Sequence, residues 1–185
     1  MGRVNSYTEA YVEDASYIIQ INIVDNLDTG RDEVNYFIAS KTITVNGEEN
    51  FIVFMGLIGS NKTQWNSDFD PYGKDRIANN GNGYSGTTNK GTVHLGFEDA
   101  KQYAYLQLFD YLGCIYHDPS AQTKIVITGH SRGAAAANLL AKDLIDSSDF
   151  AQPEDIYTYT FATPNNVKNP SKDKKYDRIF VRRER

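Results

Sequence analysis

The sequence predicts an α/β protein, because strand-like and helix-like segments alternate through its second half. Short apolar runs rich in β-branched residues at 124–128, 156–161 and 179–181 are separated by helical segments, a pattern that favours parallel pairing. The 185 residues are enough for one sizeable core, and we expect a single domain over 1–185. The expected sheet is mostly parallel and is preceded by an N-terminal helix and an antiparallel hairpin.

The N-terminal segment has the signals of a helix. Ser6 and Glu9 form an S-x-x-E capping box, which closes the first turn of a helix by reciprocal hydrogen bonds. Apolar residues including Tyr11 and Ile18 follow at helical spacing. These two features together predict a helix from about residue 7 to residue 26.

A hairpin and a long polar segment are expected next. Residues 34–45 and 51–58 are rich in β-branched and aromatic residues, and both favour strands. They are joined through Asn46 and Gly47, a dipeptide that strongly favours a two-residue hairpin turn. Residues 59–92 are polar and rich in glycine, and they predict a long loop.

The second half provides the parallel part of the sheet. A helix is expected over about 97–116, followed by a short strand at 124–128 and a helix that opens at Ser131. The strand contains Ile125, Val126 and Ile127 as an unbroken apolar run. An unbroken run, in contrast to an alternating one, predicts a central strand that is buried on both faces.

Composition excludes several classes of function. The formal net charge of −5 gives no electrostatic case for binding nucleic acid. Cys114 is the only cysteine, so neither an internal disulfide nor a thiolate metal site is expected. No apolar stretch reaches transmembrane length, and the first residues lack the apolar core of a signal peptide. The sequence leaves the cellular location open.

A G-x-S-x-G motif follows the apolar strand and opens the next helix. It is formed by Gly129, His130, Ser131, Arg132 and Gly133. A serine at a sharp strand-to-helix turn needs small neighbours on either side, and the turn presents its hydroxyl at a helix N-terminus, where an anion is stabilised. The alternative is a glycine-bounded turn in which the serine only caps the helix. The histidine of the motif is not the expected base, because its side chain leaves the turn in a different direction.

Further motifs occur in a fixed order over residues 51–181. They are Ile58-Gly59-Ser60, then Trp65 with Asp68, V-H-x-G-F at Val93, His94, Gly96 and Phe97, T-G-H-S-x-G at 128–133, A-N-L-L-A at 137–141, and Thr160, Phe161 and Pro164. In this order they resemble the class 3 lipase family, which are α/β-hydrolases. The stretches GHSRG and YTFATPN are most similar to bacterial members.

The resemblance implies hydrolysis of carboxylic esters, on acylglycerols or related lipids, through an acyl-enzyme at Ser131. The oxyanion would be bound by Ser60 and by the backbone N–H of Arg132, with no metal or organic cofactor. Implied partners are a lipid or small ester substrate and, transiently, a membrane or lipid-droplet surface. The glycine-rich segment 79–92 precedes V-H-x-G-F and is a candidate lid; the alternative is a disordered connection.

Two departures from the family pattern lie around the oxyanion site. Ile58 stands where the family usually has an arginine, so a supporting charge is lost, although Ser60 still follows. Arg132 stands where leucine is commoner. Because this residue contributes its backbone N–H, we expect the change to be tolerated, with a guanidinium near the mouth of the site that biases the choice of substrate.

The third departure concerns the catalytic triad. No histidine follows His130, and no aspartate fits the family motif near the end of the sequence, where Glu184 does not match. We expect His94 to be structural and His117 to lie in a surface turn. Without a base a serine hydroxyl is a poor nucleophile, so we expect weak or no activity. The chain is then either a truncated piece of an esterase or a natural relative; the competing hypothesis is a non-catalytic protein that binds lipid or a partner.

Overall fold

The computed structural model describes most of the chain except several connecting segments and both ends. Described are residues 6–12, 15–22, 34–59, 84–88, 91–114, 122–167, 172–177 and 179–182, with the backbone alone for 6–12, 15–22, 84–88, 91–92, 94–95 and 181–182. No helix among these residues is long and apolar enough to cross a membrane.

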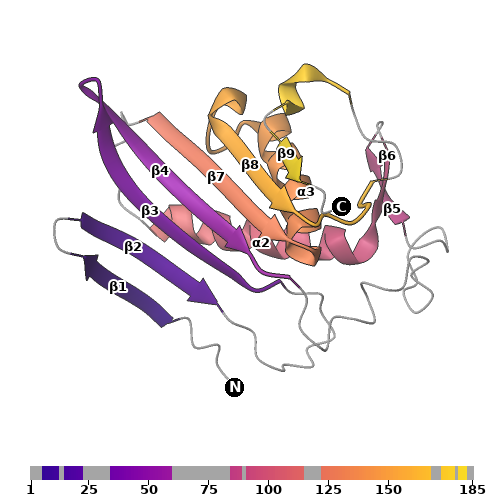
Figure 1. The fold of residues 1–185 in the computed structure, drawn as a ribbon, viewed down its shortest axis with the longest axis horizontal. Coiled ribbons are helices and arrows are strands. Elements are labelled where there is room, and N and C mark those ends of the chain that lie inside the picture. The colour runs from indigo at the N-terminus through magenta and orange to yellow at the C-terminus, as the bar shows by residue number, and fades with distance from the viewer. Residues whose placement is uncertain are drawn as a thin grey trace.

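Seven strands form one mixed sheet in the order β1-β2-β3-β4-β7-β8-β9 (Figure 1). The three pairings among β1 to β4 are antiparallel, and the three pairings from β4 to β9 are parallel. The sheet is therefore mixed, and not mostly parallel as the sequence predicted. The strands are β1 (Ser6–Val12), β2 (Ala15–Asn22), β3 (Tyr36–Val45), β4 (Glu48–Leu57), β7 (Gln122–His130), β8 (Ile156–Phe161) and β9 (Ile179–Arg182).

The predicted N-terminal helix is wrong, because residues 6–12 and 15–22 form the strands β1 and β2. The two strands pair with each other, and β2 continues the sheet by pairing with β3. Isoleucine and tyrosine dominate β2, and both favour strands. The capping box at Ser6 is a local signal of about 1 kcal/mol, which tertiary pairing overrides.

The predicted hairpin is confirmed. β3 and β4 pair from Tyr36 opposite Leu57 to Val45 opposite Glu48. Asn46 has a φ of 54° and Gly47 a φ of 85°. Positive φ at both central residues defines the type I′ turn, whose twist matches that of the strands, and this explains why Asn-Gly stands here.

Two helices cover one face of the sheet, α2 (Leu95–Cys114) and α3 (Arg132–Ser147). Alternate residues of the strands bury their side chains against these helices, since successive side chains of a strand point to opposite faces. The core that results includes Ile38, Val53, Met55, Ile125 and Ile127 from the sheet, and Ala104, Leu108, Ala137, Leu140 and Leu144 from the helices.

The strand predicted to be central is β7, and it lies between β4 and β8. Ile125 and Ile127 are fully buried against the helices, whereas Val126, on the opposite face, is half-buried. The prediction of a central strand is therefore confirmed, but burial is complete on one face only.

Part of the predicted loop 59–92 is a small antiparallel hairpin. β5 (Tyr84–Thr88) and β6 (Gly91–His94) form a separate two-stranded sheet, whose register is irregular between Ser85 and Thr88. The hairpin leads directly into α2 at Leu95. The rest of the predicted loop, apart from Gly59 at its start, lies outside the described residues.

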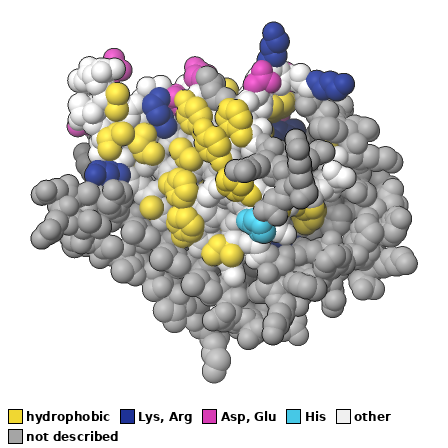
Figure 2. Space-filling model, viewed as in Figure 1, with side chains coloured by type: hydrophobic (Ala, Val, Ile, Leu, Met, Phe, Trp, Pro, Cys, Tyr) yellow, Lys and Arg dark blue, Asp and Glu magenta, His cyan; other side chains and the backbone are white. Residues whose placement is uncertain are grey.

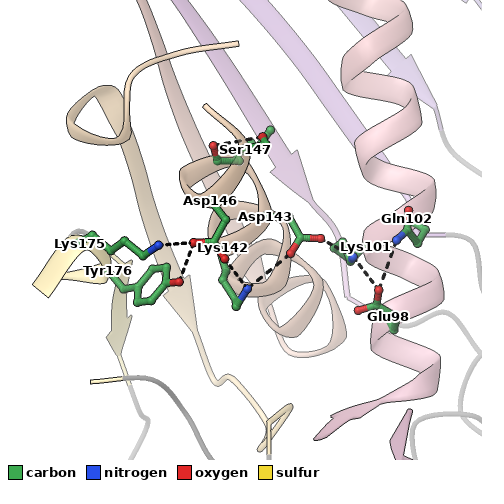
Figure 3. A network of polar contacts seen from close by, with 10 residues as sticks. Glu98, Lys101, Gln102, Lys142, Asp143, Asp146, Ser147, Lys175 and Tyr176 are labelled. Atoms are coloured by element: carbon green, nitrogen blue, oxygen red, sulfur yellow. Dashed lines mark hydrogen bonds and ion pairs between the residues drawn. The ribbon is translucent and has the colours of Figure 1, made fainter. Parts of the chain in front are cut away.

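A network of ion pairs connects the helices on the covered face of the sheet (Figure 3). Lys101 of α2 is 3% exposed, and its ammonium pairs with Glu98 at 2.6 Å and with Asp143 of α3 at 2.5 Å. Burial lowers the pKa of Lys101, but its two carboxylate partners outweigh burial and raise this pKa above the ordinary value. The ammonium is therefore charged and fixes α2 against α3.

The same network reaches the C-terminal part of the fold through Asp146. Its carboxylate pairs with Lys142 at 2.7 Å and with Lys175 at 2.5 Å, and it accepts a hydrogen bond from the Tyr176 hydroxyl at 2.7 Å. Burial raises the pKa of Asp146, but these partners hold the pKa well below its usual range. The short helix η2 (Lys174–Tyr176), which precedes β9, is thereby attached to α3.

Candidate active site

The turn between β7 and α3 is strained at Ser131. This serine has a φ of 54° and a ψ of −123°, backbone angles that residues other than glycine rarely adopt. Such a conformation costs on the order of 1–3 kcal/mol and persists only where the surroundings impose it. The Ser131 side chain makes no capping hydrogen bond to α3. The alternative of a simple capping serine therefore has no support in the geometry.

The two glycines of the motif are required by backbone contacts. A Cβ atom on Gly129 would lie 2.5 Å from the carbonyl oxygen of Gly133 and 2.8 Å from the amide nitrogen of Ala134. A Cβ atom on Gly133 would overlap the carbonyl oxygen of Leu57, at the end of β4. No side chain can be accommodated without moving backbone, so the motif G-x-S-x-G is a steric requirement of this turn.

Neighbouring strands hold the serine from both sides. Its backbone N–H donates to the carbonyl oxygen of Phe161, the last residue of β8, at 3.1 Å. On the other side, a Cβ atom on Gly59 would lie 3.5 Å from the Ser131 Cβ and 3.1 Å from the His130 carbonyl oxygen. The loop after β4 therefore begins against the serine, at the carboxyl ends of the parallel strands, which is where ligands bind in α/β sheets.

Thr160, near the end of β8, connects α3 with β9. The Thr160 hydroxyl lies 3.1 Å from Asn138 Oδ1 of α3 and 3.2 Å from the Phe180 carbonyl oxygen of β9, and it can donate to either. The Thr163 hydroxyl donates to Thr160 at 3.1 Å. These contacts fix α3 against the carboxyl end of β8 and against β9.

The V-H-x-G-F motif packs against the first turns of α3. Val93 and Phe97 form a small buried cluster with Ala135 and Leu139 of that helix. The motif therefore supports the strand-to-helix turn formed by residues 129–133, here called the elbow, through the first turns of α3. The side chain of His94 lies outside what the structure describes, and its structural role stays a prediction.

The expectation for the Arg132 side chain is wrong. Its guanidinium does not lie at the mouth of the site: the residue is 1% exposed, and Nη2 donates to the carbonyl oxygen of Gly96 at 3.2 Å. As the first residue of α3, Arg132 directs its side chain into the space between α3 and the start of α2, where the substrate is not expected to reach.

The open face of the sheet is apolar next to Ser131. His130 is exposed, and large hydrophobic side chains on the neighbouring strands are 40–48% exposed. Figure 2 shows hydrophobic side chains gathered over the sheet on this face. Those near the carboxyl ends of β4, β8 and β9 are Ile58, Tyr159, Phe161 and Phe180, of which Tyr159 and Phe180 stack at 5.1 Å between ring centroids.

Several residues considered for the site in the sequence analysis, whether favoured or rejected, lie outside the described part of the chain. They are Ser60, Trp65, Asp68, His117 and Glu184. Sequence reasoning missed two contacts, those of Gly59 and of the Phe161 carbonyl with the serine. The glycine could have been suspected from its place after a strand, but a carbonyl has no sequence signal. Within the described residues, no group of three or more His, Cys, Asp or Glu is placed to hold a metal ion.

Solved structures share this fold. A fungal lipase in an inhibitor complex matches with a TM-score of 0.56 and 22% identity, over 88% of this chain and 56% of that chain. M37 lipase matches with a TM-score of 0.52 and 15% identity, over 92% and 53%. The lipase of Rhizomucor miehei in its propeptide complex matches with a TM-score of 0.50 and 20% identity, over 88% and 48%. The chain spans about half the length of these lipases.

The mixed sheet, the helices on one face and the serine turn give the chain an α/β-hydrolase-like fold, as in the fungal lipase. Residues 51–181 match the family described as Lipase (class 3). This match covers well over half of the sequence, and the chain belongs to the class 3 lipase family. No curated protein sequence matches it.

Proposed function

We propose that this chain is the nucleophile-bearing part of a serine carboxylic-ester hydrolase, with Ser131 as the nucleophile. The observation that carries the proposal is the strained backbone of Ser131, whose side chain caps nothing and lies between two glycines that admit no Cβ. Strain of this kind lowers stability and is typical of sites where it serves a reaction. A turn that only joined β7 to α3 would not need it.

The chemistry follows from the position of the serine. The Ser131 oxygen would bond to the ester carbonyl carbon while a base takes its proton, and the carbonyl oxygen would become an oxyanion. Collapse would break the bond to the alkoxide, which would take up that proton and leave as the alcohol, and an acyl-enzyme would remain. Water would then release the acid. The N–H of Arg132 at the start of α3 and a donor on Ser60, which follows Gly59 in sequence, are the proposed oxyanion ligands. Gly59 beside Ser131 supports this arrangement.

An apolar ester is the substrate that fits the surroundings. Ile58 and Phe161 are 44% and 40% exposed. Phe161 accepts the hydrogen bond from the Ser131 N–H, and Ile58 precedes Gly59, which lies beside the serine. Burying such surface on an acyl chain gains roughly 25 cal/mol per Å². A lipid or another ester with an apolar acyl chain is therefore proposed over a small polar ester.

Turnover by this chain is proposed to be weak. Its three histidines are His94, His117 and His130, and none stands after the nucleophile in sequence. An elbow positions the hydroxyl, but a base must lie within about 3 Å to accept its proton. The absence of an assigned base favours a second candidate function, namely a binding protein that keeps the hydrolase scaffold.

The test compares the purified chain with its Ser131→Ala variant. A fluorophosphonate probe should label the wild type slowly and at Ser131 alone, and a short-chain chromogenic ester should be turned over at nearly the same low rate by both proteins. Rapid hydrolysis that disappears in Ser131→Ala would contradict the proposed weakness, and His94→Ala would be the next variant. Equal absence of label in both proteins would refute the nucleophile and favour the binding protein.

A further inference from the structure

Arg132 is an unexpected residue for the position it occupies. It is among the largest fully buried side chains of the described core, at 1% exposure, and it opens α3 immediately after Ser131. Burial of a guanidinium is costly, and the positive end of the helix dipole adds to this cost. A methionine or leucine would fill the same space without either penalty. Packing alone therefore gives no reason for an arginine here.

The contacts of this side chain lead away from the substrate and toward α2. Nη2 donates to the Gly96 carbonyl oxygen at 3.2 Å, across 36 positions of sequence. The residues on either side of Gly96 along the chain, Val93 and Phe97, are buried in an apolar cluster with Ala135 and Leu139 of α3. In these surroundings a hydrogen bond from a charged donor is strong and directional. The side chain thus joins the first residue of α3 to the first turn of α2.

We propose that Arg132 is a positioning residue, which holds the N-terminus of α3 in the orientation that oxyanion binding requires. The inference rests on the proposed function, because the group it positions is its own backbone N–H. Ser131 is already held by the Phe161 carbonyl on the sheet side. The hydrogen bond from Arg132 to Gly96 fixes the turn on the helix side, so the strained turn is held between the sheet and the helices.

The test measures phosphonylation of Ser131 in Arg132→Met, Arg132→Lys and Lys101→Met. Lys101→Met is the matched control, because it also removes a buried cation that connects α2 with α3. Saturation kinetics separate the apparent affinity for the probe from the rate constant of the bound complex. We expect Arg132→Met to lower that rate constant about tenfold with little change in affinity, as a small misplacement of an oxyanion donor does. Arg132→Lys, which keeps a donor for Gly96, should recover most of the loss.

Hydrogen exchange supplies a readout that needs no reaction. Arg132→Met should speed exchange of the amides at 96–100 and 132–136, whereas Lys101→Met should leave 132–136 unchanged. Unaltered exchange at 132–136, an unaltered rate constant in Arg132→Met, or an equal loss in Lys101→Met overturns the inference while Ser131 remains the nucleophile. If the wild type takes no label, the proposed function fails, and exchange alone then decides whether Arg132 holds the turn.

Discussion

The turn at Ser131 and the ion-pair network of Figure 3 both join distant parts of the chain, but by opposite means. At the turn, backbone atoms at the end of β4, the end of β7 and the start of α3 come so close that no Cβ fits on Gly129 or Gly133. At the Asp146 end of the network, long side chains of α3 and η2 meet in part-exposed positions, and Asp146 has three partners at once. The backbone of the turn can take only one arrangement, whereas the side chains of the network can exchange partners.

This difference predicts how each region responds to change. Loss of one pair from a network leaves the other pairs, and the freed groups are hydrated by nearby water, so each pair contributes little. An overlap between backbone atoms cannot be relieved by hydration, because interiors are close-packed and respond to added volume by strain. The turn should therefore be intolerant of substitution, and the network tolerant.

The largest effect is expected from Gly129→Ala. The added methyl group would lie 2.5 Å from the Gly133 carbonyl oxygen, a backbone atom that cannot rotate away. We expect the free energy of unfolding to fall by about 3 kcal/mol, the upper part of the range for overpacking. Urea denaturation followed by circular dichroism measures this change.

Gly113→Ala is the matched control for that prediction. Gly113 lies in the last turn of α2, and a Cβ atom there would have nothing within 4 Å. Alanine favours a helix over glycine by up to about 1 kcal/mol, so this variant should be slightly more stable than the wild type. Similar losses in the two variants would show that the turn is not sterically special.

The contrast also explains which parts of the fold could be predicted from sequence. The Asn46-Gly47 turn and G-x-S-x-G were recognisable, because each places a steric demand on residues next to one another. The helix predicted for 7–26 failed for the opposite reason. Its signals were local, but the strand β2 gains its stability from pairing with β3, which no local pattern records.

The candidate site shows the same division. Ser131 and its glycines were predicted, but the burial of Arg132 was not, since it depends on the arrival of Gly96 from another element. The contacts of the Phe161 carbonyl and of Gly59 with the serine were missed because a backbone contact between separate strands does not require a particular side chain. Sequence thus predicted the position of the serine turn and not the backbone groups that hold it.

A smaller effect, of opposite sign, is expected from Ser131→Gly. Glycine adopts positive φ without a Cβ penalty, so the substitution relieves strain at a φ of 54°. The gain exceeds the entropy that glycine adds to the unfolded chain, and we expect the free energy of unfolding to rise by about 1 kcal/mol. Ser131→Ala keeps the strained backbone and should show no such gain. A glycine variant no more stable than the alanine variant would mean that the turn stores little strain.

The smallest effect is expected from Asp146→Asn in the network. The substitution removes the charge that pairs with Lys142 and Lys175, but the Asp146 side chain is 34% exposed, so solvent screens these pairs. We expect a loss of about 1 kcal/mol or less near neutral pH, measured by thermal or urea unfolding. High salt should reduce the difference between the two proteins further.

The pH dependence of that difference identifies its cause. The partners of Asp146 depress its pKa in the folded state below the ordinary 3.8, so the folded state favours the charged carboxylate. The stabilisation is therefore fully present above about pH 4 and is lost as the pH falls through the lower folded value. Wild type and Asp146→Asn should differ by a constant amount from pH 5 to pH 8 and should converge in acid. A difference that persists unchanged at pH 2 would show that Asp146 acts through packing or through hydrogen bonds that its neutral form also makes. The contrast between a redundant charged network and a rigid backbone turn would then be wrong, because the charge of Asp146 would not be what stabilises the fold.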